Sequence, residues 1–199
     1  MSQGHYFDVD PAVPSRPAEV DLSLPDFRAR LQVDRGVFAA TAVDPGTLEL
    51  LRAAPAPPAT GDLLDLGCGY GPIACTLAHR APHAVVWAVD VNERALSLTA
   101  RNAESLALPN VRPVPPEAVP AAVRFAGIWS NPPIRVGKEA LHQLLATWLP
   151  RLEPAGQGWL VVHRHLGSDS LASWLRAEGW AVDRAGSKRG YRILQVRRP

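Results

Sequence analysis

The chain has few cysteines and no long apolar run, which argues against a disulfide-rich secreted domain and against a membrane protein. Cys68 and Cys75 are its only cysteines, too few for the disulfide framework of a small secreted domain, so a cytoplasmic setting is expected. Neither belongs to a paired Cys/His spacing, so no metal site is expected. No run approaches the roughly 20 apolar residues that span a bilayer, and the first residues have no apolar signal core. We therefore expect no membrane partner.

Net charge is also small. The 21 Lys and Arg residues nearly balance the 19 Asp and Glu residues, giving +2 at pH 7. This value is compatible with nucleic-acid binding but does not indicate it. The 199 residues, 47% of them hydrophobic, suit one globular domain. Nothing here sets the oligomeric state, and a monomer is favoured.

Proline is in excess, with 20 residues, about twice the usual ~5%. Prolines gather in Pro55–Gly61 and Leu108–Pro120, and we interpret both stretches as surface connections. The alternating pattern of residues 18–33 predicts a β-hairpin. Asp44 and Pro45 are a favourable N-cap and first residue for a helix over 44–54.

From Asp62 onward, strand and helix patterns alternate. The expected strands are 62–67, 84–90, 125–131 and 156–165, and the expected helices are 71–80, 92–108, 136–150 and 168–179. Such alternation indicates an α/β fold with a mostly parallel sheet and helices on both faces. Residues 180–198 read as two strands joined by a short turn, so the last strand should run antiparallel. We expect an N-terminal extension over 1–43 and one globular unit over 44–199.

A glycine-rich loop, "LDLGCGYGP", joins the first of these strands to its helix. Glycines at 67, 69 and 71 allow a sharp turn and close approach of the backbone to a ligand. Asp90 ends the next strand, where a carboxylate can hold ribose hydroxyls. The spacing is not the dinucleotide G-x-G-x-x-G, which argues against an NAD-type oxidoreductase. Asp65 suits a cationic amino group better than a pyrophosphate, which favours S-adenosylmethionine. The alternative is a turn that serves packing alone.

The stretch "SNPP" places an amide at the tip of the predicted strand 125–131. Proline cannot sit inside a central strand, so the strand should stop here. The side-chain carbonyl of Asn131 and the backbone carbonyl of Pro132 are two acceptors that match the two N–H groups of a planar exocyclic amine. Holding both hydrogens frees the nitrogen lone pair for a methyl group, by positioning and a preorganised polar site. The alternative is a turn without chemistry.

Together "LDLGCGYGPI", "VDVNERAL" and "SNPPIRVGK" resemble a class I S-adenosylmethionine-dependent methyltransferase. With "DRGVFAATAVDPGTLELL" and "SKRGYRIL", they resemble the single-domain branch related to small-subunit ribosomal RNA guanine-N2 methyltransferases. The resemblance implies a Rossmann-like seven-stranded sheet with an antiparallel last strand. It implies catalytic positions at Asn131, Pro132, Pro133 and Ile134. It implies a cofactor site formed by Asp65, Gly67, Cys68, Gly69, Gly71, Asp90, Val91, Asn92 and Asn131. Ile134 departs from the family, where this position is often aromatic.

Five further residues are candidates for binding the acceptor. Phe38 lies against the cofactor or the target base, or in the core. Cations at Arg135, Lys138, Lys188 and Arg189 hold phosphates if they flank the cleft mouth, and otherwise form an ordinary charged surface. His163 and His165 are expected to face solvent or RNA.

The sequence thus predicts a methyltransferase that acts on an exocyclic amine, with guanine-N2 of ribosomal RNA as the favoured acceptor and ribosomal RNA or the small ribosomal subunit as partner. An adenine amine, a protein glutamine and a small metabolite are alternative acceptors. A cofactor- or RNA-binding protein without catalysis is the alternative of a different class.

Overall fold

The computed structural model describes residues 14–198, apart from the side chain of Arg135. Two strands, β1 (Ala18–Ser23) and β2 (Arg28–Val33), form an antiparallel hairpin that precedes the main sheet. The strands of the main sheet are β3 (Asp62–Leu66), β4 (Val85–Val89), β5 (Val111–Val114), β6 (Phe125–Ser130), β7 (Leu152–His163), β8 (Ala181–Lys188) and β9 (Tyr191–Arg197). The α-helices are α1 (Pro45–Ala53), α2 (Pro72–Arg80), α3 (Glu93–Ser105), α4 (Lys138–Trp148) and α5 (Ser168–Ala177).

The seven-stranded sheet has the order β5-β4-β3-β6-β7-β9-β8. Strands β3 to β7 pair in parallel, while β9 lies between β7 and β8 and is antiparallel to both. The predicted fold class, including the reversed last strand and the N-terminal hairpin, is confirmed. Because the sheet grows outward in both directions from β3 and β6, these two strands form its topological switch point.

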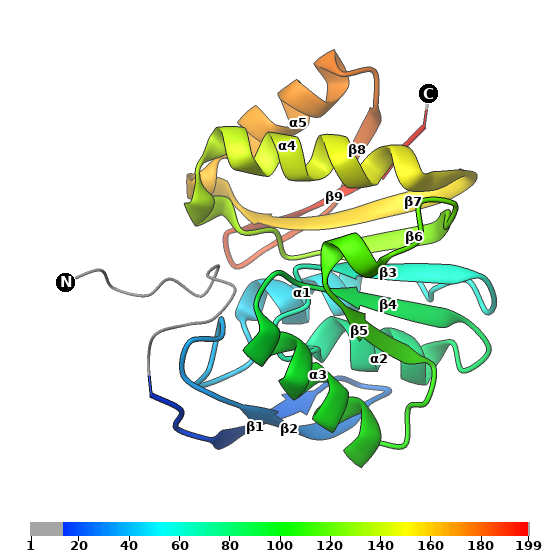
Figure 1. The fold of residues 1–199 in the computed structure, drawn as a ribbon. Helices are drawn as coiled ribbons and strands as arrows, with labels where there is room; N and C mark the ends of the chain where they lie inside the picture. Colours follow the sequence, from blue (N-terminus) through cyan, green and yellow to red (C-terminus); the bar gives the residue numbers. More distant parts are fainter. Residues whose placement is uncertain (1–13, 199) are drawn as a thin grey trace.

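Two apolar layers cover the sheet. Helices α1, α2 and α3 and the hairpin pack on one face, and α4 and α5 on the other (Figure 1). Alternate residues of β4 supply both layers: Val86 joins the first, and Trp87 the second. This alternation follows from the two-residue period of a strand buried on both faces.

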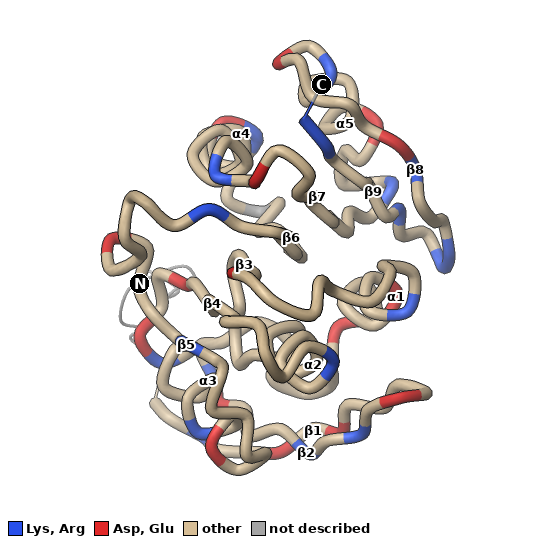
Figure 2. The backbone as a smooth tube through the Cα atoms, turned by 90° about the vertical axis from the view of Figure 1, so that its right-hand side faces the viewer, with Lys and Arg blue, Asp and Glu red and all other residues tan. Residues whose placement is uncertain are grey.

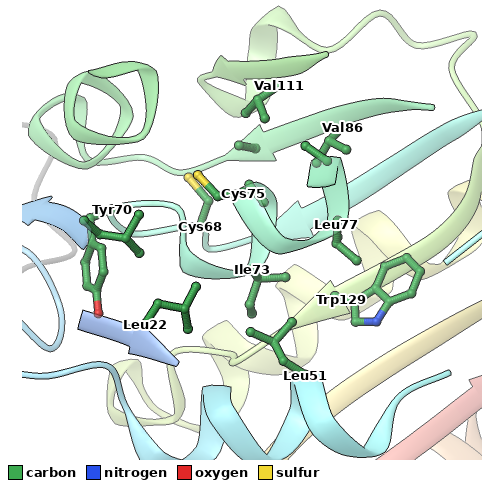
Figure 3. Close-up of a cluster of buried hydrophobic side chains, with 14 of the residues drawn as sticks. Leu22, Leu51, Cys68, Tyr70, Ile73, Cys75, Leu77, Val86, Val111 and Trp129 are labelled. Atoms are coloured by element: carbon green, nitrogen blue, oxygen red, sulfur yellow. The ribbon is translucent and has the colours of Figure 1, made fainter. Parts of the chain in front are cut away.

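One expectation about the fold is wrong. We expected residues 108–120 to be a surface connection, but Val111–Val114 form strand β5, and residues 116–118 form a 3₁₀ turn. The proline content concealed the strand. Strand β5 is at the edge of the sheet, where the missing N–H of Pro113 is tolerated, and Val111 reaches the core beside Val86 (Figure 3).

The hairpin is fastened to the rest of the fold through a buried amide. The side-chain oxygen of Asn102 accepts the N–H of Gln32 at 2.7 Å, and its nitrogen donates to the carbonyls of Gln32 at 3.0 Å and Tyr70 at 2.8 Å. Tyr70, from the glycine loop, is itself buried beside Leu22 of the hairpin (Figure 3). Asn102 therefore links β2, α3 and the glycine loop, and holds that loop against a rigid scaffold.

Residues 14–198 hold neither a membrane-spanning helix nor a metal-binding cluster. None of the helices in residues 14–198 has the length and apolar character needed to cross a membrane. Over the same residues, no cluster of three or more His, Cys, Asp or Glu side chains is arranged to hold a metal ion.

Candidate functional site

A pocket of about 570 Å³ opens at the carboxyl ends of the parallel strands. Its walls come from the loops that follow β3, β4, β6 and β7, and from the segment before α1. In an open parallel sheet, ligands bind at this end and beside the switch point. The topology thus brings the glycine loop and Asn131, which are far apart in the sequence, to one cavity.

The glycine loop presents bare backbone to this pocket. Gly67 and Gly69 have φ of +75° and +57°, a conformation that glycine adopts without strain. A Cβ atom built on either residue would meet nothing within 4 Å, so both residues face open space. Gly71 is different, because it caps α2 and a Cβ there would be 2.9 Å from Thr99. Gly67 and Gly69 are therefore the ones that admit a ligand.

The carboxylate of Asp90 is fixed beside the glycine loop. Its two oxygens accept the backbone N–H groups of Gly69 at 2.9 Å and Asn92 at 3.0 Å. Burial raises the pKa of Asp90, and these backbone hydrogen bonds partly offset the effect. Each carboxylate oxygen keeps a second lone pair, so Asp90 can still accept hydrogen bonds from a pair of hydroxyl groups in the pocket.

Asp65 lies beneath the glycine loop and is fully buried. One of its oxygens accepts the N–H of Ala74 at 2.9 Å, and the other has no hydrogen-bond partner among the described residues. Burial, with a smaller contribution from the charge of Asp90, raises the pKa of Asp65 to about 8. The structure does not place Asp65 on the pocket wall. An unpaired buried carboxyl oxygen nevertheless suits a donor that is absent from the protein itself.

Asn131 is oriented by two residues at the start of α1. Its amide nitrogen donates to a carboxylate oxygen of Asp44 at 2.8 Å and to the hydroxyl oxygen of Thr47 at 3.0 Å. The amide is a wall of the pocket, as are both of its partners. With the nitrogen occupied in this way, the carbonyl oxygen of Asn131 is the atom left to accept a hydrogen bond from a ligand.

The two prolines after Asn131 form a tight turn. The N–H of Ile134 donates to the carbonyl of Pro132 at 2.8 Å, and Pro133 between them has φ −73° and ψ 76°, the geometry of an inverse γ-turn. The carbonyl of Pro132 therefore has one lone pair in use and one available. Asn131, Pro132, Pro133 and Ile134 all line the pocket.

Strands β7 and β9 contribute a further wall of the pocket. Tyr191 packs so closely against Gly46 that a Cβ there would be 2.6 Å from the Tyr191 ring. Burial raises the pKa of the Tyr191 hydroxyl, and the nearby charge of Asp44 adds to the shift. His163 meets the Tyr191 ring edge-on, with ring centres 5.0 Å apart. This wall is therefore partly aromatic, and it touches the segment that orients Asn131.

Four exposed apolar side chains belong to segments that line the pocket. The large hydrophobic side chains that are exposed in the described part of the chain are Phe38, Val91, Val136 and Leu166. Three of them line the pocket, and Val136 lies in the turn that follows Ile134. We call these four residues the apolar rim. Exposed apolar patches of this kind mark binding sites.

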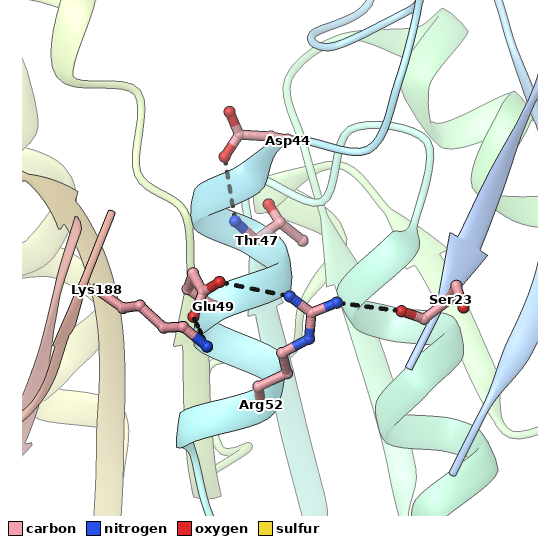
Figure 4. A network of polar contacts seen from close by, with 6 residues as sticks. All are labelled: Ser23, Asp44, Thr47, Glu49, Arg52 and Lys188. Atoms are coloured by element: carbon pink, nitrogen blue, oxygen red, sulfur yellow. Dashed lines mark hydrogen bonds and ion pairs between the residues drawn. The ribbon is translucent and has the colours of Figure 1, made fainter. Parts of the chain in front are cut away.

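The structure thus brings together most of the candidate residues. Those that line the pocket are Gly67, Cys68, Gly69, Asp90, Val91, Asn131, Pro132, Pro133, Ile134 and Phe38. Those that do not are Asp65, Gly71, Asn92, Lys138, Lys188 and Arg189. Asn92 is buried and caps α3, and Lys188 lies 3.8 Å from Glu49 (Figure 4). The side chain of Arg135 lies outside the described residues.

Sequence reasoning did not assign several polar and aromatic residues to the pocket. Asp44 was recognised only as a helix cap, and Thr47 and Tyr191 were not singled out. His163, expected to face solvent or RNA, lines the pocket together with His165. A signal was present for His163, since it ends the strand that neighbours β6 and so lies beside Asn131. Tyr191 lies in the stretch "SKRGYRIL" that carries part of the family resemblance, but no pattern in that stretch gave it a role in the pocket.

A Rossmann-like sheet with a glycine loop, a carboxylate after β4 and an Asn-Pro-Pro turn after β6 defines a class I methyltransferase. Comparison with known proteins agrees. The family model for the methyltransferase small domain matches residues 28–195. This chain belongs to that family, and the resemblance to class I S-adenosylmethionine-dependent methyltransferases is confirmed.

The relatives differ in length. The uncharacterized protein YbxB of Bacillus subtilis (strain 168) is 32% identical over 197 residues, which cover 98% of each chain. Ribosomal RNA small subunit methyltransferase C of Shewanella pealeana is 29% identical over 168 residues, which cover 76% of this chain but 49% of that protein. The chain thus spans about half the length of this second kind of relative.

Among solved structures, the chain is similar to the T. Thermophilus 16S rRNA N2 G1207 methyltransferase (RsmC) in complex with AdoMet and guanosine. The TM-score is 0.80 at 25% sequence identity, and the match covers 95% of this chain and 52% of that one. A ribosomal protein L11 methylase from Lactobacillus delbrueckii subsp. bulgaricus has a TM-score of 0.61 at 17% identity, which shows the shared fold alone.

Proposed function

We propose that this chain transfers a methyl group from S-adenosylmethionine to the exocyclic N2 amine of guanine in ribosomal RNA. The observation that carries the proposal is the orientation of Asn131. Its amide nitrogen is held by Asp44 and Thr47, so its carbonyl oxygen is the free acceptor in a pocket that it shares with the glycine loop. An acceptor in that place suits a ligand with an N–H donor.

The residues present fit the cofactor. Gly67 and Gly69 leave open space beside their backbone, Asp90 has lone pairs for two ribose hydroxyls, and Asp65 has one unpaired buried oxygen for an ammonium group. The cofactor, when bound, supplies an electrophilic methyl group on a sulfonium. Because Asp65 lies beneath the loop and not on the pocket wall, it would attract the ammonium group through its charge. This attraction requires the Asp65 carboxyl to be ionised in the complex, against its pKa of about 8 in the free protein.

The residues after β6 orient the amine that accepts the methyl group. In the proposed arrangement, the carbonyls of Asn131 and Pro132 accept the two N–H hydrogens of the amine, so the nitrogen lone pair turns toward the methyl group. Transfer would form a bond between this nitrogen and the methyl carbon, the bond from that carbon to the sulfonium sulfur would break, and the nitrogen would then lose one proton to solvent. No strong base is required, because orientation and preorganised dipoles supply most of the effect.

The pocket mouth suits a flat, partly apolar acceptor such as an unpaired base. The apolar rim belongs to segments that line the pocket, and the pocket wall includes Ile134, Tyr191 and His163. Single-stranded RNA is recognised by splaying out bases and packing them on such side chains. Ile134 offers the base an aliphatic surface where an aromatic ring would stack, and the aromatic contribution comes from Tyr191 and His163.

The distribution of Lys and Arg residues is compatible with an RNA acceptor. Lys and Arg residues are spread over the molecule and include a group at the turn between β8 and β9 (Figure 2). Lys188 and Arg189 in that turn are exposed, although Glu49 partly neutralises Lys188. Because Tyr191 follows this turn and lines the pocket, these cations lie near enough to meet phosphates flanking a bound base.

Labelled methyl transfer tests the proposal. The acceptor is ribosomal RNA from cells that lack this chain, offered both as free RNA and as assembled small subunits. The controls are Asn131→Ala and free guanosine. We expect label in RNA with the wild type and a loss of at least about a hundredfold with Asn131→Ala. Label in protein or small molecules, or equal labelling by Asn131→Ala, would overturn the proposal.

A further inference from the structure

We propose that Asp44 is a positioning residue for methyl transfer: with Thr47, it holds the Asn131 amide in the one orientation that accepts the target amine. This inference rests on the proposed function for the identity of the acceptor, but the clamp itself is a property of the free chain. We call Asp44, Thr47 and Asn131 the amide clamp. The contact joins residues 87 positions apart, from α1 and the tip of β6.

The clamp matters because an asparagine amide has two orientations of nearly the same shape. In one, the carbonyl faces the pocket and can accept an amine N–H. In the other, the NH₂ group faces the pocket and meets the amine donor to donor. An ionised carboxylate is an acceptor only, so the 2.8 Å contact with Asp44 requires the amide nitrogen on that side. The Asn131 carbonyl therefore already faces the pocket in the free protein, where it can accept an N–H of the target amine.

Asp44 is itself held in place. The oxygen that accepts from Asn131 also accepts the N–H of Thr47 at 3.1 Å, which makes Asp44 the N-cap of α1. The next turn is pressed against Tyr191, because a Cβ on Gly46 would be 2.6 Å from the tyrosine ring and 2.9 Å from the Asp44 carboxylate. Removing the Asp44 carboxylate therefore removes the hydrogen-bond acceptor of the Asn131 amide. The site is closely packed, so another side chain has little room to take its place.

The far end of α1 is fixed by a separate network. Glu49, which is 5% exposed, lies 3.4 Å from Arg52 and 3.8 Å from Lys188, and Arg52 donates to the carbonyl of Ser23 at 3.4 Å (Figure 4). This network joins α1 to the N-terminal hairpin and to β8 without touching Asn131. It supplies a matched control: Arg52→Ala loosens the same helix at its other end.

The first test separates the clamp from the helix cap. Kinetic constants and cofactor affinity are measured for wild type, Asp44→Ala, Asp44→Asn, Thr47→Val and Arg52→Ala. We expect Asp44→Ala to lower kcat by about 10- to 100-fold, which corresponds to the free energy of one charge-assisted hydrogen bond. The cofactor Kd of this variant should stay within about twofold of the wild-type value. Asp44→Asn keeps an acceptor oxygen and a good N-cap, and should recover most of kcat. Thr47→Val removes the second acceptor and should cost about two- to fivefold in kcat.

Different outcomes identify a merely structural role. If Asp44 only caps the helix, Asp44→Ala lowers the melting temperature as Arg52→Ala does, and kcat is unchanged in both. That result would overturn the clamp. So would an Asp44→Asn variant as slow as Asp44→Ala, since the acceptor oxygen would then be irrelevant. If Asp44→Ala fails to fold, kcat of Thr47→Val tests the clamp, because this variant keeps the Asp44 helix cap and nearly the same side-chain volume. An unchanged kcat in Thr47→Val would then overturn the clamp.

The second test does not depend on the acceptor. In the ¹⁵N-labelled full chain, the side-chain amide signal of Asn131 is assigned by its absence in Asn131→Ala. The clamp predicts proton shifts displaced from those of an exposed asparagine amide, and slow exchange with solvent, in wild type and Asp44→Asn. Asp44→Ala should give shifts close to those of an exposed amide and faster exchange with solvent. An unchanged signal in Asp44→Ala would refute the clamp, even if the acceptor proves not to be RNA. A wild type that shows the clamp but methylates no RNA would refute only the proposed function.

Discussion

Replacing Asp65 by asparagine should stabilise the folded chain at neutral pH and weaken cofactor binding. The carboxyl of Asp65 is fully buried, and its pKa rises from 3.8 to about 8 on folding, mainly because burial disfavours the charge. At pH 7 the folded chain must therefore keep a proton that the unfolded chain has released. That linkage costs on the order of 4 kcal/mol at pH 7. Asparagine has the same shape and carries no such cost.

The sign of the pH dependence follows directly. A carboxyl whose pKa is raised by folding contributes stability below about pH 4, and that contribution is lost as the pH rises through 8. The asparagine variant loses about 1–3 kcal/mol of stability for a different reason. Its NH₂ group would occupy the position of the Asp65 oxygen that has no hydrogen-bond partner, so the NH₂ group would be buried without an acceptor. We expect Asp65→Asn to be more stable than wild type by about 1–3 kcal/mol near pH 7.5, with no advantage at pH 5.

Chemical denaturation of both proteins without cofactor, from pH 5 to pH 8.5, measures this difference. A difference in unfolding free energy that is the same at every pH would refute the reasoning, because the linkage would then be absent. The gain in stability should be matched by a loss of function. We expect the wild type to bind S-adenosylmethionine more tightly as the pH rises toward 8, since the ammonium needs the ionised carboxylate, and Asp65→Asn to bind weakly at all pH values.

Two further predictions concern Asp90 and Gly46. Asp90→Ala should raise the cofactor Kd by about tenfold or more, because the carboxylate proposed to hold the ribose is lost; calorimetry showing unchanged affinity would contradict the ribose assignment. Gly46→Ala should lower kcat with little effect on cofactor Kd, since the new Cβ would be 2.6 Å from the Tyr191 ring. Gly186→Ala is its matched control, because a Cβ there meets nothing closer than 3.5 Å; equal kcat in both variants would show that the Gly46 contact does not matter.

Features encoded by neighbouring residues could be predicted from the sequence. The N-cap at Asp44 and the positions of Gly67 and Gly69 follow from local backbone preferences. Asp90 and Asn131 were placed correctly at strand tips because the strand–helix alternation fixes which ends of parallel strands meet. The antiparallel last strand followed from a link too short for a crossover.

Features that depend on tertiary contacts could not be predicted. The hydrogen bond from Asn131 to Asp44 spans 87 positions, and no local pattern encodes it. Tyr191 reaches the pocket only because β9 is inserted between β7 and β8. Strand β5 was missed because Pro113 opposes strand formation except at a sheet edge, and edge position is a property of the whole sheet.

Depth of burial was the other missing quantity. The sequence places Asp65 two residues before Gly67 but does not show that its carboxylate lies beneath the loop, fully buried, instead of on the pocket wall. The pKa of about 8 depends on that burial. The side chain of Tyr70 likewise belongs to the loop by sequence, yet it packs into the core beside the hairpin.

The central claim is that the Asn-Pro-Pro turn directs methylation to an exocyclic amine of guanine. The most direct measurement is the identity of the methylated nucleoside. Ribosomal RNA from cells lacking this chain is incubated with enzyme and S-adenosylmethionine, digested, and analysed by mass spectrometry. We expect N2-methylguanosine with the wild type and none with Asn131→Ala. A methylated adenosine, a ring- or ribose-methylated product, or N2-methylguanosine made equally by Asn131→Ala would contradict the central claim.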